Sequence, residues 1–291
     1  MEAVDGTRCA LLARAREEPL AGTAPVAARW VCVEHRGAWP RDVAAHPDPS
    51  VAGFAARASA SGYRLLLVRR PGRSRPGPTR VHLADTTPGT ARATRLTVDG
   101  PRELDDVPLP RTGPLPGDAA PDPLLLVCTH GRRDRCCAVD GRALAVAVAA
   151  TGEPDVWECS HLGGHRFAPT ALVLPTGYLY GRLDPASAVA ARKAAALGEV
   201  ETGLSRGRST WSPAGQVAEL AVRELTGLRD ADALVLDPTA RPGPVVVHGP
   251  GGRRWSVQVE EHDGPGPRPA SCGAAALPYR SLRSTAVTAL P

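Results

Sequence analysis

Two short segments of the chain carry closely spaced side chains of the kinds that bind metals. The first, Cys128-Thr-His-Gly-Arg-Arg-Asp-Arg-Cys-Cys137, places eight residues between Cys128 and Cys137. The second, His161-Leu-Gly-Gly-His165, places three residues between two histidines. Thiolate and imidazole groups are preferred ligands of zinc and of iron–sulfur clusters. Together the two segments offer four ligands for one metal centre.

The spacing bears on which metal these ligands would hold. Paired cysteines in zinc fingers are usually separated by about two to four residues. Eight residues is wide for a zinc knuckle but does not exclude zinc. A two-iron cluster spans more space than a single ion, and therefore tolerates a wider loop. Gly163 and Gly164 let the backbone approach a cluster and leave room for the imidazole rings. The spacing favours a cluster over zinc.

The elements around these segments would bring the ligands together. The hydrophobic pattern predicts strands at 124–128, 155–159, 171–174 and 178–181, and helices at 138–150 and 184–197, the last capped by Asp184. If the first two strands are parallel neighbours, the loops that follow them leave the same edge of the sheet. The order β-α-β-loop-β-β-α is the minimal thioredoxin-like arrangement.

The chain divides into four predicted parts: an N-terminal α/β domain (1–105), a proline-rich linker (106–123), a thioredoxin-like domain that carries the four candidate ligands (124–230), and a C-terminal β-hairpin extension and tail (231–291). We therefore assign an α/β fold class, with a second α/β domain before the thioredoxin-like one. The first domain also has trailing strands, which suggests that it too is thioredoxin-like and that the fold is duplicated.

Secondary structure is predicted along the rest of the chain as well. In the first domain we expect helices at 9–17 and 50–60, the second capped by Ser50, and strands at 30–34, 63–68, 81–84 and 94–98. Further on we expect a helix at 212–225, capped by Ser212, and a hairpin of strands at 245–247 and 254–260. Beyond Asp263 we expect a loop-like tail.

Composition excludes several classes of protein. Gly and Pro each account for 30 of the 291 residues, and aromatic residues for 4%, so cores must be built from Ala, Val and Leu. The net charge of +5 is carried almost entirely by Arg, with no aromatic residues interleaved as a single-strand nucleic-acid binder requires. We expect no nucleic-acid partner.

The sequence also indicates where the protein works. The longest apolar stretch, residues 143–150, is far short of the roughly 20 residues that span a membrane. The first residues lack the continuous apolar segment of a secretory signal. Seven cysteines, an odd number, argue against a disulfide framework and for a reducing compartment. We expect a cytoplasmic protein without a membrane partner.

The two ligand-bearing segments resemble the sucrase/ferredoxin-like family, over CTHGRRDRCCAVDGR and VWECSHLGGHRFAPTALVLPTGYLYGRL. Upstream, Gly22-Thr-Ala24 and Trp30…Glu34…Gly37-Ala-Trp39 also fit, and residues 212–219 fit less closely. The resemblance implies a thioredoxin-like [2Fe-2S] ferredoxin whose ligands are Cys128, Cys137, His161 and His165. Nothing supports the sucrase part of the family name, because no carboxylate pair in a glycosidase setting stands out.

This ligand set implies an electron-transfer protein of raised potential. Two thiolates and two neutral imidazoles leave an oxidised two-iron cluster about neutral, whereas four thiolates leave it at about −2. A neutral centre accepts an electron more easily.

Because both histidines lie on one tight loop, we expect them to bind the same iron. We expect their other ring nitrogens to exchange a proton as the cluster changes charge. We expect an electron carrier rather than an enzyme with its own substrate, served by a reductase and an acceptor that the sequence does not identify. It does not indicate the oligomeric state.

Two other functions compete with electron transfer. A thioredoxin-fold oxidoreductase would work through Cys136, Cys137 or Cys159, but no C-x-x-C motif supports it. A zinc-stabilised structural module would use the same four ligands as the cluster. Colour and metal content separate the three functions.

The remaining candidate residues have ordinary structural interpretations. We expect Cys136 to pack as a small hydrophobic residue, Cys159 to be buried in its strand, and Cys9, Cys32 and Cys272 to be structural or incidental. His130 could support the ligands from nearby or face solvent. The arginines of the Cys loop could be simply solvated, or form a positive rim that raises the potential and steers an acidic redox partner: Arg132, Arg133, Arg135 and, after the second histidine, Arg166.

Overall fold

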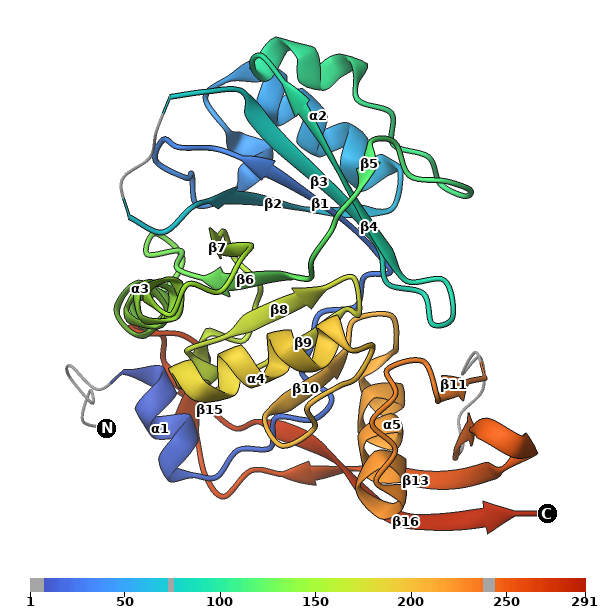
Figure 1. Cartoon of the computed structure of the whole chain (residues 1–291). Coiled ribbons are helices and arrows are strands. Elements are labelled where there is room, and N and C mark those ends of the chain that lie inside the picture. The colour runs from blue at the N-terminus through green and yellow to red at the C-terminus, as the bar shows by residue number, and fades with distance from the viewer. Residues whose placement is uncertain (1–7, 73–75, 238–243) are drawn as a thin grey trace.

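A mixed sheet of ten strands forms the centre of the part of the chain that the structure describes (Figure 1). This computed structural model describes residues 8–72, 76–237 and 244–291, so small pieces of the predicted first domain (1–7 and 73–75) and of the predicted C-terminal part (238–243) lie outside it. The strand order is β10-β9-β8-β6-β7-β2-β1-β3-β4-β5. Strands β1 to β5 make up one half of the sheet and β6 to β10 the other.

The elements of the first half follow an initial helix, α1 (Cys9–Ala15). They are β1 (Arg29–Glu34), α2 (Pro49–Ala60), β2 (Tyr63–Arg69), β3 (Thr79–Asp85), β4 (Arg92–Val98) and β5 (Asp118–Ala119). The second half contains β6 (Leu124–Cys128), a π-helical turn η3 (Cys137–Gly141), α3 (Arg142–Ala150), β7 (Val156–Cys159), β8 (Ala171–Leu174), β9 (Tyr178–Tyr180), α4 (Pro185–Ala196) and β10 (Ser205–Arg208). The strands and helices predicted for 9–197 are present within a few residues of their expected bounds, whereas β5 and β10 were not predicted.

The two halves share one strand arrangement. In the first half the order is β2-β1-β3-β4, and in the second it is β7-β6-β8-β9. In both, the first two strands are parallel across a helical crossover, and the third and fourth strands are antiparallel. The expected duplication is therefore present in the strand order. The mixed α/β class is confirmed, and the thioredoxin-like assignment stays a prediction.

Side chains of the central strands point alternately to the two faces of the sheet, and each face packs against its own hydrophobic core. Leu125 and Val127 of β6 face a core with α3 and α4, while Leu124, Leu126 and Cys128 face the opposite side. Strand β1 alternates in the same way, because successive side chains point to opposite faces. The inner faces of both halves contribute to one shared hydrophobic core, and α2, α3 and α4 cover outer faces.

Strands β2 and β7 join the halves into one continuous sheet. They pair antiparallel, with Val68 opposite Cys159, and the Arg69 Nε donates to a Glu158 carboxylate oxygen at 2.7 Å. The predicted linker, residues 106–123, lies along the first half, where β5 pairs with β4 and Leu115 is buried. The division into domains stays a prediction.

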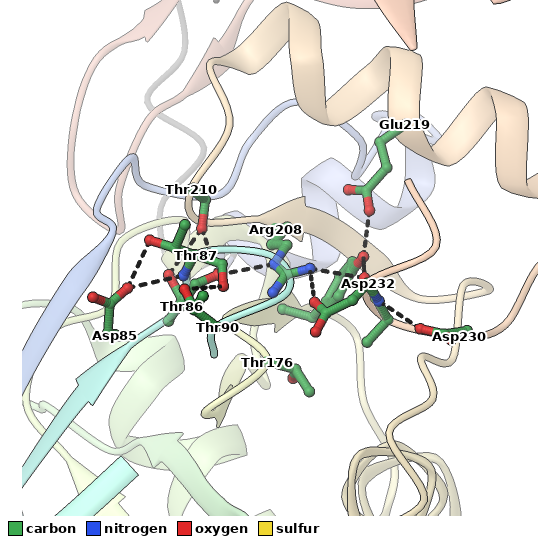
Figure 2. A network of polar contacts seen from close by, with 12 residues as sticks. Asp85, Thr86, Thr87, Thr90, Thr176, Arg208, Thr210, Glu219, Asp230 and Asp232 are labelled. Atoms are coloured by element: carbon green, nitrogen blue, oxygen red, sulfur yellow. Dashed lines mark hydrogen bonds and ion pairs between the residues drawn. The ribbon is translucent and has the colours of Figure 1, made fainter. Parts of the chain in front are cut away.

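Arg208 of β10 joins the two halves a second time. Its buried guanidinium donates to the carbonyl oxygen of Thr86, just after β3, at 3.1 Å, and to that of Ala231 at 2.7 Å. It also pairs with the Asp232 carboxylate at 2.8 Å. Figure 2 shows Arg208 lying between Thr86 and Asp232, with Thr210 bonded to the same Thr86.

Two predicted helix caps are confirmed and one is wrong. Asp184 and Ser212 cap α4 and α5 (Pro213–Thr226) as expected. Helix α2 begins earlier than predicted, because Asp48 caps it: the Ser50 amide donates to the Asp48 carboxylate at 2.9 Å. Pro49 then takes the first helical position, where its missing N–H is not needed. None of the helices in the described ranges is long and apolar enough to cross a membrane.

The C-terminal part forms a second sheet against α5 (Figure 1). Its order is β11 (Val235–Leu236), β12 (Val245–His248), β13 (Arg254–Asp263) and β16 (Arg280–Leu290), and a small pair, β14 (Arg268–Pro269) and β15 (Ala276–Leu277), lies between. The hairpin of β12 and β13 is confirmed. The expected loop-like tail is wrong, because β16 pairs with β13 along its length. Most β16 side chains are exposed, so its sequence carries little hydrophobic alternation.

Candidate metal centre

Cys128 and Cys137 lie where β6 ends and the next helical segment begins. Strands β6 and β7 are parallel neighbours, with Cys128 opposite Cys159, so the loops after them leave the same edge of the sheet, as predicted. Both thiols are buried in the core that the two halves share. The predicted Cys pair therefore faces the inside of the molecule rather than solvent.

His161 completes a tight group with these two cysteines. The Sγ atoms of Cys128 and Cys137 and a ring nitrogen of His161 all lie within 4.8 Å of one another. His161 is half-buried, and its Nδ1 is buried without a hydrogen-bond partner among the described residues. Two thiols and an imidazole nitrogen are a suitable donor set for zinc or iron.

His165, the fourth predicted ligand, lies beside this group rather than within it. Its ring centroid is 5.4 Å from that of His161, with the planes tilted by 30°. Its Nε2 lies 2.7 Å from the carbonyl oxygen of Ala270. A carbonyl can only accept, so Nε2 carries the proton and Nδ1, buried and without another partner in the described chain, keeps its lone pair. Ligating histidines usually have this arrangement, with one nitrogen free for the metal and the other bound to a carbonyl.

Gly141 allows the turn that starts at Cys137 to reach the end of β6. A Cβ on Gly141 would collide with the carbonyl oxygen of Cys128. The close approach holds the π-helical turn directly against the strand that ends in the first ligand. Glycine is therefore required here by contact rather than by backbone angle.

The protonation states of the two thiols differ. The hydrogen bond from the Cys137 thiol, followed by those from His161 and from the amides of His130 and Leu162, lowers the pKa of Cys128 well below its ordinary value. As the donor, and by burial, Cys137 has a raised pKa. Burial lowers the pKa of His165, which keeps its imidazole neutral near pH 7. Cys128 is thus the first thiolate of the site.

Arg206 of β10 is hydrogen-bonded to the loop that carries the two histidines. Its buried guanidinium donates to the carbonyl oxygen of Gly163 at 3.0 Å, and to the hydroxyl and carbonyl oxygens of Thr23. Burial lowers the pKa of Arg206 to about 9. Gly164 takes a positive φ of 70° and lies so close to this guanidinium that a side chain would collide with it. The contacts to Thr23 give a role to the middle residue of the Gly22-Thr-Ala24 motif, whereas Arg206 itself was missed because β10 was not predicted.

The loop between the two cysteines has an exposed side and a buried side. Arg132, Arg133 and Arg135 are exposed, as a solvated loop or a positive rim requires. His130 is buried, with its ring edge-to-face on Trp39 at 5.9 Å between centroids. The alternative that His130 faces solvent is therefore wrong.

Arg166, expected in the positive rim, is bound elsewhere. Its Nε pairs with the buried Glu18 carboxylate at 2.7 Å, and its guanidinium lies over the Phe167 ring. Arg268 of β14 pairs with the same carboxylate oxygen. Arg166 thus ties the residues after the histidine loop to the N-terminal segment.

A second group of metal-binding side chains was not predicted. Cys9, Asp134, Cys136 and Cys272 have ligand atoms within 4.8 Å of one another. The sequence predicts structural or incidental roles for Cys9 and Cys272, and a packing role for Cys136. They lie far apart in the sequence, so no local spacing connects them. Cys159 is buried in β7 as expected, and burial raises its pKa well above the ordinary value.

Comparison with known proteins places the chain in a family. Residues 20–191, more than half of the chain, match the sucrase/ferredoxin-like family. The match runs from before β1 into α4 and includes the Cys pair and both histidines, but not Cys9 or Cys272. No curated protein and no solved structure matches the chain. The resemblance seen in the two ligand-bearing segments is therefore confirmed over most of the ten-stranded sheet, and the chain belongs to the sucrase/ferredoxin-like family.

Proposed function

We propose that this protein transfers electrons by means of a [2Fe-2S] cluster held by Cys128, Cys137, His161 and His165. The observation that carries the proposal is the convergence of two buried thiols and His161, with a second histidine alongside whose Nδ1 is free. The family name points to a ferredoxin-like role. When bound, the cluster supplies the reversible uptake of one electron.

The residues present fit such a group. Two buried imidazole nitrogens without partners, one on each histidine, leave donors that a metal centre would satisfy. Cys128 is already disposed to be a thiolate, because neighbouring donors lower its pKa. The two-thiol, two-imidazole set carries two negative charges fewer than four thiolates. We therefore expect a potential well above the roughly −400 mV of plant-type ferredoxins.

The charge of a neighbouring side chain also raises the expected reduction potential. The buried Arg206 adds positive charge behind the histidine loop, which favours the reduced state. The Ala270 carbonyl holds the His165 Nε2–H, so loss of that proton also costs a hydrogen bond. We expect proton release from the histidine pair to couple to the redox state and to lower the midpoint potential as the pH rises. A potential that stays flat from about pH 6 to 10 would count against this coupling.

The thiol-oxidoreductase alternative is less well supported. Burial raises the pKa of Cys159, and the hydrogen bond to Cys128 raises that of Cys137. The hydrogen bond from Cys9 lowers the pKa of Cys136 to about 7, but Cys136 is completely buried. Reactive cysteines need exposure as well as thiolate character. A zinc module remains the stronger competitor, since the donor set also suits zinc.

We propose a reducing compartment, the cytoplasm, because seven cysteines, an odd number, do not fit a disulfide framework. Its partners would be a reductase and an acceptor protein rather than nucleic acid or a membrane. The exposed arginines Arg132, Arg133 and Arg135 lie on the loop that carries the Cys ligands. They would attract an acidic redox partner to the part of the surface above the cluster.

Metal analysis and spectroscopy test the proposal. We expect a red-brown protein with visible charge-transfer bands and about two irons and two sulfides per chain. His161→Cys and His165→Cys should each keep a cluster and lower its potential, because a thiolate adds negative charge. The control His248→Gln, on β12, should change neither spectrum nor potential. A colourless protein with zinc in this site, or one without metal and with reactive thiols, would overturn the proposal.

A further inference from the structure

Three thiols from distant parts of the chain meet next to the candidate cluster site. Cys9 lies at the start of α1, Cys136 directly before the π-helical turn, and Cys272 between β14 and β15. The Sγ–Sγ distances are 3.6 Å from Cys9 to Cys136, 3.4 Å from Cys136 to Cys272, and 3.6 Å from Cys272 to Cys9. The three sulfur atoms thus form a nearly equilateral triangle.

A carboxylate lies against this triangle. Both Asp134 carboxylate oxygens are 3.8 Å from the Cys9 Sγ. They accept hydrogen bonds from the backbone amides of Cys136 at 2.8 Å and Cys272 at 2.9 Å. Cys9 and Cys136 are completely buried, Asp134 is 4% exposed, and Cys272 is partly exposed. The four groups form a largely closed pocket of ligand atoms.

The spacing of the sulfur atoms suits a single tetrahedral ion. Zinc–sulfur bonds of about 2.3 Å place tetrahedral sulfur ligands about 3.8 Å apart. The observed 3.4 to 3.6 Å requires only a small expansion around the ion. A four-iron cluster would bind each thiol to a different iron, and a two-iron cluster would bind at least one of the three to its second iron, so either would hold sulfurs farther apart than one ion does. A disulfide would join two of the thiols and leave the third without a partner.

We infer that Cys9, Cys136 and Cys272, with Asp134 as the fourth ligand, bind a structural zinc ion. Zinc is favoured over iron(II) by thiolate sites, and closed four-coordinate sites of this kind stabilise a fold. The site uses none of the four proposed cluster ligands, and its Asp134 carboxylate lies 3.7 Å from the His165 Nε2. Cys9 and Cys272 lie outside residues 20–191, so the family match does not assign it.

Such an ion would connect the N-terminal helix and the C-terminal part of the chain to the loop between Cys128 and Cys137. It would tie α1 and the segment between β14 and β15 to residue 136, which adjoins a candidate cluster ligand. Ala270, whose carbonyl holds His165 at 2.7 Å, is two residues from Cys272. The zinc site would therefore keep this carbonyl in place and support the position of His165.

Metal content of the full-length protein, purified from medium that contains both iron and zinc, tests the inference. We expect about one zinc per chain in addition to the cluster iron. Cys272→Ser and Cys9→Ser should lose the zinc and retain iron and sulfide. Cys128→Ser should do the opposite. The matched control Cys32→Ala, which removes a buried thiol from β1, should retain both metals.

A second measurement uses the unaltered protein, in case the variants fold poorly. Alkylation of native protein, followed by peptide mass spectrometry, should modify Cys272 slowly until a zinc chelator is added and rapidly afterwards. The inference fails if the purified protein contains no zinc, or if the zinc is retained in both Cys272→Ser and Cys9→Ser. Loss of two hydrogens from these thiols, as in a disulfide, would also overturn it. Zinc that leaves only with Cys128→Ser would overturn this inference and the cluster proposal together.

Discussion

The guanidinium of Arg206 donates a 3.0 Å hydrogen bond to the carbonyl oxygen of Gly163, in the middle of the loop that carries His161 and His165. The same guanidinium is bonded to Thr23, so one buried cation connects the N-terminal segment, β10 and the histidine loop. Because the pKa of Arg206, lowered by burial to about 9, still lies above neutral pH, the cation persists beside the site. Its position and its charge lead to the first prediction.

Arg206→Met should weaken both the fold and the metal centre. It leaves the carbonyl oxygens of Gly163 and Thr23 without a donor, at a cost of about 1–3 kcal/mol for each group left unsatisfied. It also removes a positive charge, which should lower the midpoint potential. Urea unfolding and a redox titration measure the two effects. Arg253→Met, at an exposed arginine of the C-terminal part, is the control, and equal behaviour of the two variants would contradict the assigned role.

Gly141→Ala should destabilise the protein although it adds only a methyl group. That methyl would collide with the Cys128 carbonyl oxygen and push the π-helical turn away from β6. Overpacking of this kind costs about 1–3 kcal/mol, and here it should also reduce metal retention. Gly53→Ala in α2 is the matched control, since nothing lies within 4 Å of the added atom. It should stabilise the helix by roughly 0.5–1 kcal/mol. Thermal unfolding and iron content compare the two variants.

His82 should make stability fall in mild acid. This β3 side chain is buried edge-to-face against Trp157, with neither ring nitrogen bonded to a described residue. Burial lowers the pKa of His82 to about 4, whereas an unfolded chain has an ordinary pKa of about 6.5. Between these two pKa values the unfolded state binds more protons than the folded state. The contribution of neutral His82 to the free energy of unfolding is therefore fully present above pH 6.5 and is lost as the pH falls toward 4. The loss amounts to about 3 kcal/mol.

His82→Phe keeps a ring against Trp157 and removes the titrating group. The free energy of unfolding of the wild type, measured by urea at several pH values, should fall more steeply below pH 6.5 than that of the variant. His248→Gln, in the C-terminal sheet, controls for the loss of a partly buried histidine whose Nε2 lies 3.0 Å from the Asp237 carboxylate. Identical slopes for wild type and His82→Phe would rule out this contribution.

Reversing the charge of the Cys loop should slow electron exchange with anions. The triple variant with Glu at Arg132, Arg133 and Arg135 should be oxidised by ferricyanide more slowly than the wild type, and the difference should shrink at high salt. A cationic oxidant should show the reverse order. Glu at three exposed arginines of the C-terminal sheet, Arg253, Arg254 and Arg283, is the matched control. Equal ferricyanide rates for the two triple variants would exclude a steering rim at the Cys loop.

Local patterns predicted most elements of the large sheet and the parallel pair that carries the site. Leu124–Cys128 is an unbroken apolar run, and Asp184 and Ser212 are helix caps whose hydrogen bonds reach only three residues along the chain. Signals of this range can be seen in the sequence itself. Strand β10 and strand β16 were missed because arginine and glycine in the first, and exposed small residues in the second, hide the alternation that marks a strand.

The sequence by itself determined that Cys128, Cys137 and His161 would meet, because two adjacent strands and the short loops after them fix these positions. Only the tertiary structure decided what surrounds them. Arg206 reaches the histidine loop from a strand with no visible pattern, and Ala270 reaches His165 from the C-terminal segment. Cys9 and Cys272 lie 263 residues apart and meet at Cys136. Such contacts depend on how remote segments pack against a common core, so they cannot be predicted from the spacing of residues along the chain.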